Sequence, residues 1–318
     1  MVDDRIGKVA VFGTGQMGPG VAAISALAGC SVTLVGRSPE AAQRGQAAVD
    51  AALSFLAENK IISQRAAKAA HARLTVSDNA GAAAPADLVV ESIIEDLAIK
   101  QQFFCELEDL FGTDAIIASN TSALPITQIA AHMKHPQRAV TTHFWNPPHL
   151  MPLVDIIKGE KTSLETVERA YAFLKRCGKE PVIGRKDVPG QVGNRLFAAV
   201  NREAIYMVQE GICSAEDAEI AIKNGFGLRF PVYGPFEHMD AIGLDMALAV
   251  QASVAPSLCN LPEALPLLKE LVAQGKLGVK TGQGFYDWAT RDIAAIRRQR
   301  DLFLIERIKA QKKTAKGT

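Results

Sequence analysis

The chain has 318 residues, with 35 lysines and arginines against 34 aspartates and glutamates and a formal net charge of +1 at pH 7. This balance argues against a chain-wide surface for nucleic acid or another polyanion, and 48% apolar residues suffice for a large core in one or two domains. The five cysteines form no CxxC pair, so we expect neither a zinc site nor disulfides, and a reducing cytoplasm fits. No targeting segment and no membrane span are expected either.

Strand-like and helix-like stretches alternate along the first half of the chain. The strand candidates are KVAVFG, SVTLV, DLVVESI, AIIASN and RAVTTHF. Runs that are apolar on both faces are typical of a mostly parallel sheet covered by helices. After Asp187 the pattern changes to helices with glycine and proline joints, one of them beginning at Ser214. We therefore predict an α/β domain over residues 1–187 and an all-α domain over residues 188–318.

A GxGxxG motif, formed by Gly13, Gly15 and Gly18, follows the first strand directly and opens a helix. The first glycine permits a tight turn, the second lets the backbone approach a pyrophosphate, and the third lets helix and strand pack closely. Gln16 and Met17 complete the loop. In this context the motif predicts a Rossmann domain that binds a dinucleotide cofactor.

The second strand ends at a position where dinucleotide-binding folds usually carry an acidic residue. Here that position is Gly36, followed by Arg37 and Ser38. Arg37 and Ser38 would suit the 2′-phosphate of NADP, and the missing carboxylate removes a barrier to it. Alternatively, Ser38 caps the next helix, with Pro39 at its first position, and Arg37 stacks on adenine or points to water.

Two later stretches supply candidates for catalysis at strand ends. SNTS covers Ser119–Ser122, and HFWNPPHLMPLVD contains His143, Asn146 and Asp155. A histidine can exchange a proton with a substrate hydroxyl while hydride passes to or from a nicotinamide, and a carboxylate on its other nitrogen fixes the tautomer. Taken alone, His143 would more often be a satisfied structural histidine, because sequence spacing cannot establish spatial proximity.

The chain resembles the 3-hydroxyacyl-CoA dehydrogenase family, which includes gulonate dehydrogenase and lambda-crystallin. Seven motifs in order carry the resemblance: VFGTGQMGPGVA, VVESIIEDLAIKQQFF, ASNTSALPIT, HFWNPP, KDVPGQVGNR, GPFEHMDAIGLD and GKLGVKTGQGFYDW. It implies a Rossmann domain that uses NAD, followed by a helical domain that forms a homodimer.

The resemblance also implies roles for individual residues. It makes His143 the general acid/base, oriented by an acidic residue at position 155, and it makes Ser122 and Asn194 hydrogen-bonding partners of the substrate. Asn146 is a further substrate-binding candidate. The residues that the resemblance places on the cofactor side are Glu95, Lys100 and Asn120.

Three features depart from the family pattern. Position 155 is more commonly glutamate in relatives, and Asp155 is one methylene shorter. Position 36 lacks the usual acidic residue, so NAD is the family cofactor whereas the local chemistry favours NADP. The prolines of NPPHLMPLVD look more like the branch acting on free hydroxy acids than the fatty-acyl-CoA branch. A basic stretch, Lys60–Leu74, could contact CoA phosphates or could be a solvated face.

We therefore expect an NAD(P)-dependent oxidoreductase that interconverts a short 3-hydroxyacyl-CoA, or a related 3-hydroxy acid, and its 3-keto form. Fatty acid metabolism is the setting that the resemblance implies. The alternative is a non-catalytic, crystallin-like protein that binds a dinucleotide in a structural or sensing role.

Overall fold

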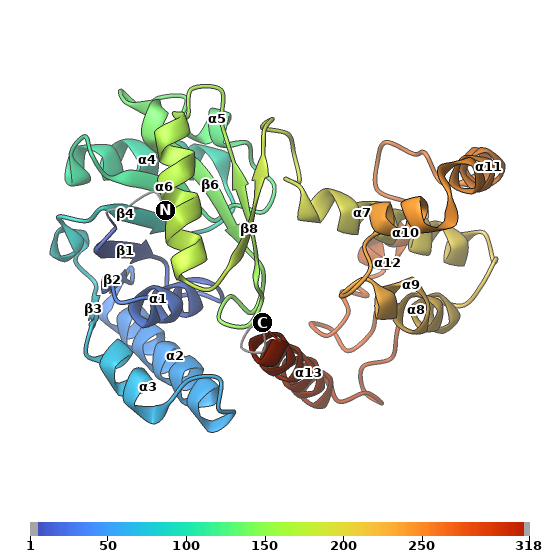
Figure 1. The fold of residues 1–318 in the computed structure, drawn as a ribbon, viewed down its shortest axis with the longest axis horizontal. Helices are drawn as coiled ribbons and strands as arrows, with labels where there is room; N and C mark the ends of the chain where they lie inside the picture. The colour runs from blue at the N-terminus through green and yellow to red at the C-terminus, as the bar shows by residue number, and fades with distance from the viewer. Residues whose placement is uncertain (1–5, 315–318) are drawn as a thin grey trace. The chain divides into compact units, whose positions relative to one another are not determined.

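A computed structural model describes residues 6–314, with side chains as far as Gln311 (Figure 1). By its contacts the chain forms two compact units. The first contains the described residues up to Arg195 and those from Gln299 onward, and the second is Leu196–Arg298. The boundary between two domains after residue 187 stays a prediction. The sequence did not predict that the last helix packs on the first unit.

The first unit is built on an eight-stranded sheet in the order β3-β2-β1-β4-β5-β6-β7-β8. All neighbouring strands run parallel except β6 and β7, which pair antiparallel. The strands are β1 (Lys8–Phe12), β2 (Ser31–Val35), β3 (Leu74–Ser77), β4 (Leu88–Glu91), β5 (Ile116–Ser119), β6 (Ala139–Phe144), β7 (Leu153–Ile157) and β8 (Glu180–Gly184). The predicted mostly parallel sheet is confirmed.

Helices cover both faces of this sheet, as Figure 1 shows. They are α1 (Gly18–Leu27), α2 (Pro39–Glu58), α3 (Gln64–His71), α4 (Leu97–Phe111), α5 (Ile126–Ile129) and α6 (Leu164–Arg176). Alternation along β1 divides the core. Val9 and Val11 pack with α1, α2 and α6, while Ala10 and Phe12 pack with α4 and α5. Strands buried on both faces therefore explain the continuous apolar runs of the sequence.

The second unit is helical, which confirms the predicted helical C-terminal region. Its helices are α7 (Gly193–Gln209), whose first turn lies in the first unit, α8 (Ala215–Asn224), α9 (Phe226–Arg229), α10 (Pro235–Ile242), α11 (Leu244–Val254) and α12 (Pro266–Ala273). Ser214 caps α8, as expected, because its Oγ accepts a hydrogen bond from Asp217 N at 3.0 Å. No helix among the described residues is long and apolar enough to cross a membrane, and no group of three metal-ligating side chains occurs among them.

The last helix, α13 (Ile293–Thr314), packs its second half on the first unit. Ile305 is buried in a small cluster with Leu56 of α2 and Leu150. Leu150 belongs to the β6–β7 connection, so α13 supports the segment that joins the strands of His143 and Asp155.

A buried lysine fixes the same segment from another side. Lys179, 4% exposed, donates hydrogen bonds from Nζ to the carbonyls of Pro148 at 2.5 Å and Met151 at 2.9 Å. Burial lowers the pKa of Lys179 to about 8. The ammonium thus ties the β6–β7 connection to the start of β8.

This lysine predicts a pH dependence of stability. From about pH 8 to its ordinary value of 10.5 the unfolded chain holds a proton on Lys179 that the folded chain has lost, so the free energy of unfolding rises with pH across this interval. The gain is at most about 3 kcal/mol. Denaturant unfolding at both ends of the interval should show this gain in the wild type and not in Lys179→Met. Parallel pH dependences in the two proteins would contradict it.

Candidate active site

The centre of the site is a histidine–aspartate pair on adjacent strands. In the antiparallel ladder of β6 and β7, His143 lies directly opposite Asp155, which explains how residues twelve positions apart come together. His143 Nδ1 lies 3.1 Å from Asp155 Oδ2, and the two residues are 6% and 0% exposed. Since a carboxylate only accepts hydrogen bonds, the proton of a neutral imidazole sits on Nδ1 and leaves Nε2 as the acceptor.

Asp155 accepts three hydrogen bonds. Besides His143, the indole Nε1 of Trp145 donates to Oδ2 at 3.1 Å, and the backbone N–H of Gly193 donates to Oδ1 at 3.0 Å. Burial alone would raise the pKa of Asp155, but the hydrogen bonds from His143, Trp145 and Gly193 outweigh it and hold that pKa below its ordinary value. The carboxylate is therefore the stable form beside the imidazole.

The SNTS loop is anchored by a buried charge network. Lys100, 1% exposed, places its Nζ 2.5 Å from Glu91 Oε1 and 3.3 Å from Glu95 Oε2. Glu91, 0% exposed at the end of β4, also accepts from the Ile93 N–H at 2.8 Å and from Ser119 Oγ at 2.6 Å. Each oxygen of the buried carboxylate is thus satisfied, as a charge removed from water requires.

Glu95 holds the same loop from the other side. Its Oε1 accepts from Thr121 Oγ1 at 2.6 Å and from the backbone N–H groups of Ser122 at 2.9 Å and Ala123 at 3.1 Å. Burial raises the pKa of Glu95, but the hydrogen bond from Thr121 and the charge of Lys100 outweigh it and lower that pKa. Glu95 and Lys100, both predicted on the cofactor side, therefore also fix the loop that carries Ser122.

Asn120 links the ends of three strands. Its Nδ2 donates to Ser92 Oγ at 2.9 Å, and its Oδ1 accepts from the Phe144 N–H at 2.8 Å. Ser92 follows β4 and Phe144 ends β6 beside His143, so Asn120 sets the spacing of the loops at the carboxyl edge of the sheet. Open α/β sheets bind ligands at this edge.

The two predicted substrate contacts, Ser122 and Asn194, lie next to each other. Asn194 Nδ2 donates to the backbone carbonyl of Ser122 at 3.0 Å, and the buried Gln191 donates from Nε2 to the carbonyl of Thr121 at 3.1 Å. The first turn of α7 is thereby fastened to the SNTS loop. Asn146 is exposed after β6, and no hydrogen bond joins it to this group in the part of the chain that the structure describes.

The glycine motif has the geometry that a pyrophosphate needs. Gly13 has φ +111°, and a Cβ there would lie 2.3 Å from the Ser92 carbonyl. A Cβ on Gly18 would lie 1.8 Å from the Gly13 carbonyl, whereas one on Gly15 would meet no atom within 4 Å. Gly13 and Gly18 are thus required by the fold, and Gly15 leaves open space before α1. Gln16 is exposed beside it, and Met17 packs partly on the core. A dinucleotide fits this cradle.

The end of β2 shows why the usual acidic residue is missing. Gly36 is buried, and a Cβ there would lie 2.7 Å from the backbone nitrogen of Ala42. Ser38 caps α2, because its Oγ accepts from the Ala41 N–H at 3.2 Å. Arg37 is exposed. The capping interpretation of Ser38 is therefore confirmed, and Arg37 lies exposed beside it.

Sequence reasoning gave no role to Glu91, Trp145 or Gln191. A signal existed for Glu91, since a carboxylate within the buried run DLVVESI needs partners. Trp145 follows His143 by two residues, so the two side chains leave the backbone on the same side. Gln191, with φ +49°, gives no sequence signal that we recognise.

Comparison with known proteins places the chain in a family. Residues 8–188 match the model of the 3-hydroxyacyl-CoA dehydrogenase NAD binding domain, and residues 190–288 match the model of the C-terminal domain of the same family. The probable 3-hydroxybutyryl-CoA dehydrogenase of Bacillus subtilis is 38% identical over 89% of this chain and 98% of its own.

A second relative matches more of the chain. The 5-formyl-3-hydroxy-2-methylpyridine 4-carboxylate 5-dehydrogenase of Mesorhizobium japonicum is 34% identical over 95% of this chain and 98% of its own. A crystal structure of such a 5-dehydrogenase, described as an NAD+ dependent dismutase, superposes with a TM-score of 0.88 at 33% identity, covering 95% of this chain and 97% of that one. The chain therefore belongs to the 3-hydroxyacyl-CoA dehydrogenase family of NAD-binding oxidoreductases.

Proposed function

We propose that this protein is a dehydrogenase that interconverts a 3-hydroxy compound, as a free acid or a short acyl-CoA, and its 3-keto form. The observation that carries the proposal is the His143–Asp155 pair, which lies at the carboxyl edge of a sheet whose glycine loop suits a dinucleotide. NAD, when bound, accepts the hydride in oxidation and supplies it in reduction.

The side chains of the site divide the remaining work. His143 Nε2 takes the hydroxyl proton of the alcohol, and Asp155 stabilises the imidazolium through Nδ1–H. In reduction the same proton returns from Nε2 to the developing alkoxide. Ser122 and Asn194, fastened to each other, donate hydrogen bonds to the oxygens of the substrate.

We assign the substrate as a free acid and not as an acyl-CoA thioester. The match to the Mesorhizobium enzyme spans 95% of this chain, so it must extend beyond the family models, which end at residue 288, and into α13. That relative is named for a carboxylate, 5-formyl-3-hydroxy-2-methylpyridine 4-carboxylate. The superposition with such a 5-dehydrogenase, at a TM-score of 0.88, supports a free hydroxy or keto acid as the substrate.

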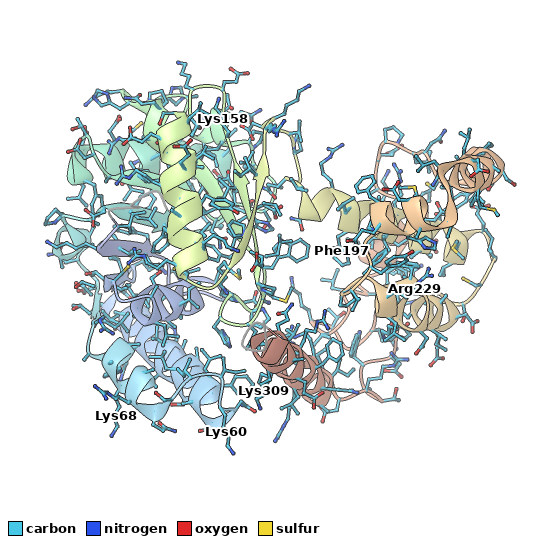
Figure 2. All side chains as sticks on the ribbon, in the orientation of Figure 1. Lys60, Lys68, Lys158, Phe197, Arg229 and Lys309 are labelled. Carbon is cyan, nitrogen blue, oxygen red and sulfur yellow. The ribbon has the colours of Figure 1, made fainter. Side chains whose placement is uncertain are left out.

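The basic stretch Lys60–Leu74 gives CoA less support than its composition suggests. His71 Nδ1 lies 2.8 Å from Asp50 Oδ1, and Arg73 donates to the Ala69 carbonyl at 3.2 Å. Lys60 and Lys68 project from the surface, as Figure 2 shows. Local contacts thus occupy part of the predicted phosphate face.

The experiment for this proposal is a spectrophotometric screen. Acetoacetyl-CoA and a series of free 3-keto and 3-hydroxy acids are assayed with NAD(H) and with NADP(H). We expect nicotinamide-dependent turnover, fastest with a free acid. Faster turnover of acetoacetyl-CoA would reverse the assignment of the carrier, and no turnover with either class would overturn the proposed reaction.

Cofactor preference provides a further prediction. Because no side chain fits at Gly36 and Arg37 is exposed beside it, we propose that the site accepts NADP as well as NAD. Arg37→Asp should raise KM for NADPH by roughly tenfold or more and leave KM for NADH within about twofold, since a guanidinium–phosphate contact amounts to about 1.5–3 kcal/mol. Steady-state kinetics with both cofactors measure this. Equal changes in both KM values would contradict a role of Arg37 in binding the 2′-phosphate.

We also propose a homodimer formed by the helical unit. Several large apolar side chains of that unit are exposed in the single chain, among them Leu196, Phe197, Leu228, Val232, Phe236 and Leu248. An apolar surface of this extent is typical of a protein interface. Light scattering of the purified protein tests it, and a monomer at micromolar concentration would contradict it.

A further inference from the structure

The orienting carboxylate has a second side-chain donor. Asp155 Oδ2 accepts both from His143 Nδ1 and from Trp145 Nε1, each at 3.1 Å. His143 is in β6, and Trp145 follows the end of that strand, so one strand end presents both donors to one oxygen. Asp155 Oδ1 is occupied by the Gly193 N–H at 3.0 Å. With donors on both oxygens, the carboxylate has one favoured rotation about its terminal bond.

The indole ring is also wedged in place. A Cβ added to Gly193 would lie 2.6 Å from Trp145 Cζ2 and 3.2 Å from Cε2, so the ring packs directly against the backbone of this glycine. The ring centroids of Trp145 and His143 are 5.8 Å apart at 59°. Trp145 therefore contacts both the imidazole and the first turn of α7.

Asp155 needs such support because it is short. Aspartate has one methylene fewer than glutamate and so reaches less far from β7 toward His143. Its 3.1 Å contact with Nδ1 is longer than a usual charge-assisted hydrogen bond of about 2.7–2.9 Å. Small rotations of the carboxylate would lengthen that contact, and the indole N–H opposes them.

We propose that Trp145 is a positioning residue, whose indole N–H fixes Asp155 Oδ2 toward His143 Nδ1 and whose ring seats this pair against Gly193. This inference rests on the proposed function, since it gives Trp145 a part in orienting the general acid/base. It also makes Gly193 a requirement of the site, because any side chain there would displace the ring.

The test is Trp145→Phe, which keeps an aromatic side chain at this position and removes the N–H donor together with part of the indole ring system. We expect kcat to fall about tenfold, equal to about 1.4 kcal/mol, with KM within about twofold. The indole donor lowers the pKa of Asp155, so its loss raises that pKa. An unchanged kcat would overturn the inference.

A second readout does not depend on turnover. In protein labelled with heavy nitrogen in histidine, the Nδ1–H of His143 should give a low-field proton resonance, assigned by its loss in His143→Asn. Trp145→Phe should shift or broaden this resonance, and Trp288→Phe, the same change at the only other tryptophan, should leave it in place. A resonance unaltered by Trp145→Phe would contradict the inference even if no substrate were found. A failed substrate screen with an altered resonance would instead count against the proposed function alone.

Discussion

Replacing His143 with asparagine should lower kcat by about 10²–10⁴-fold, the range that general acid/base catalysis contributes. Asparagine is the sharpest choice because its Nδ2 lies where the imidazole Nδ1 lies and can still donate to Asp155 Oδ2. Only the acceptor at Nε2 is lost. Steady-state kinetics with the best substrate of the screen measure the effect.

Binding separates this loss from misfolding. NADH binding, followed by fluorescence titration, should keep its Kd within about twofold in His143→Asn, because the glycine cradle of Gly13 to Gly18 does not involve the imidazole. Undiminished turnover in this variant would mean that another group is the base. A protein that binds NADH and turns over no substrate would favour the crystallin-like alternative.

The second large effect is expected for Asp155→Asn. The amide has one oxygen for three donors, and its NH₂ group must face either the Gly193 N–H or the pair formed by His143 and Trp145. Two hydrogen-bond donors that face each other repel and disrupt the site. An amide NH₂ toward His143 favours the imidazole tautomer that carries its proton on Nε2 and not on Nδ1. We expect kcat to fall about 10³–10⁴-fold, with little change in KM.

The same variant should change how stability depends on acid. The pKa of Asp155 is lowered on folding, so its contribution is complete above the unfolded value of about 3.8 and is lost as pH falls through the folded value. Asp155→Asn should be less stable than the wild type at neutral pH by about 1–3 kcal/mol, the cost of an unsatisfied buried donor. The difference should shrink below about pH 4, as denaturant unfolding would reveal. A constant difference would mean that the carboxylate does not carry it.

The sheet could be predicted from the sequence because strands that are buried on both faces are continuous apolar runs. The glycine loop could be predicted because only glycine fits the close backbone contacts at Gly13 and Gly18. Periodicity carries no information about the direction of the last strands, so the antiparallel pairing of β6 with β7 was not predicted. That pairing is what puts Asp155 opposite His143.

The parts that escaped prediction depend on contacts between distant segments. The bond from Trp145 to Asp155 and the buried network of Glu91 and Lys100 need distances that spacing cannot supply. The return of α13 depends on the fit of Ile305 against Leu56 and Leu150. In the site, residues whose chemistry the reaction requires could be predicted. Residues whose role depends only on their position in the fold could not.

The most direct test of hydride transfer assisted by His143 is to trace the transferred hydrogen with deuterium. A substrate carrying deuterium on its hydroxyl-bearing carbon is oxidised by the wild type and by His143→Asn, and the deuterium content of the reduced nicotinamide is measured against time. The wild type should transfer the deuterium to the nicotinamide, and His143→Asn should make the same transfer at least about 10²-fold more slowly. Deuterium that appears in water instead, or equal rates in the two proteins, would contradict it.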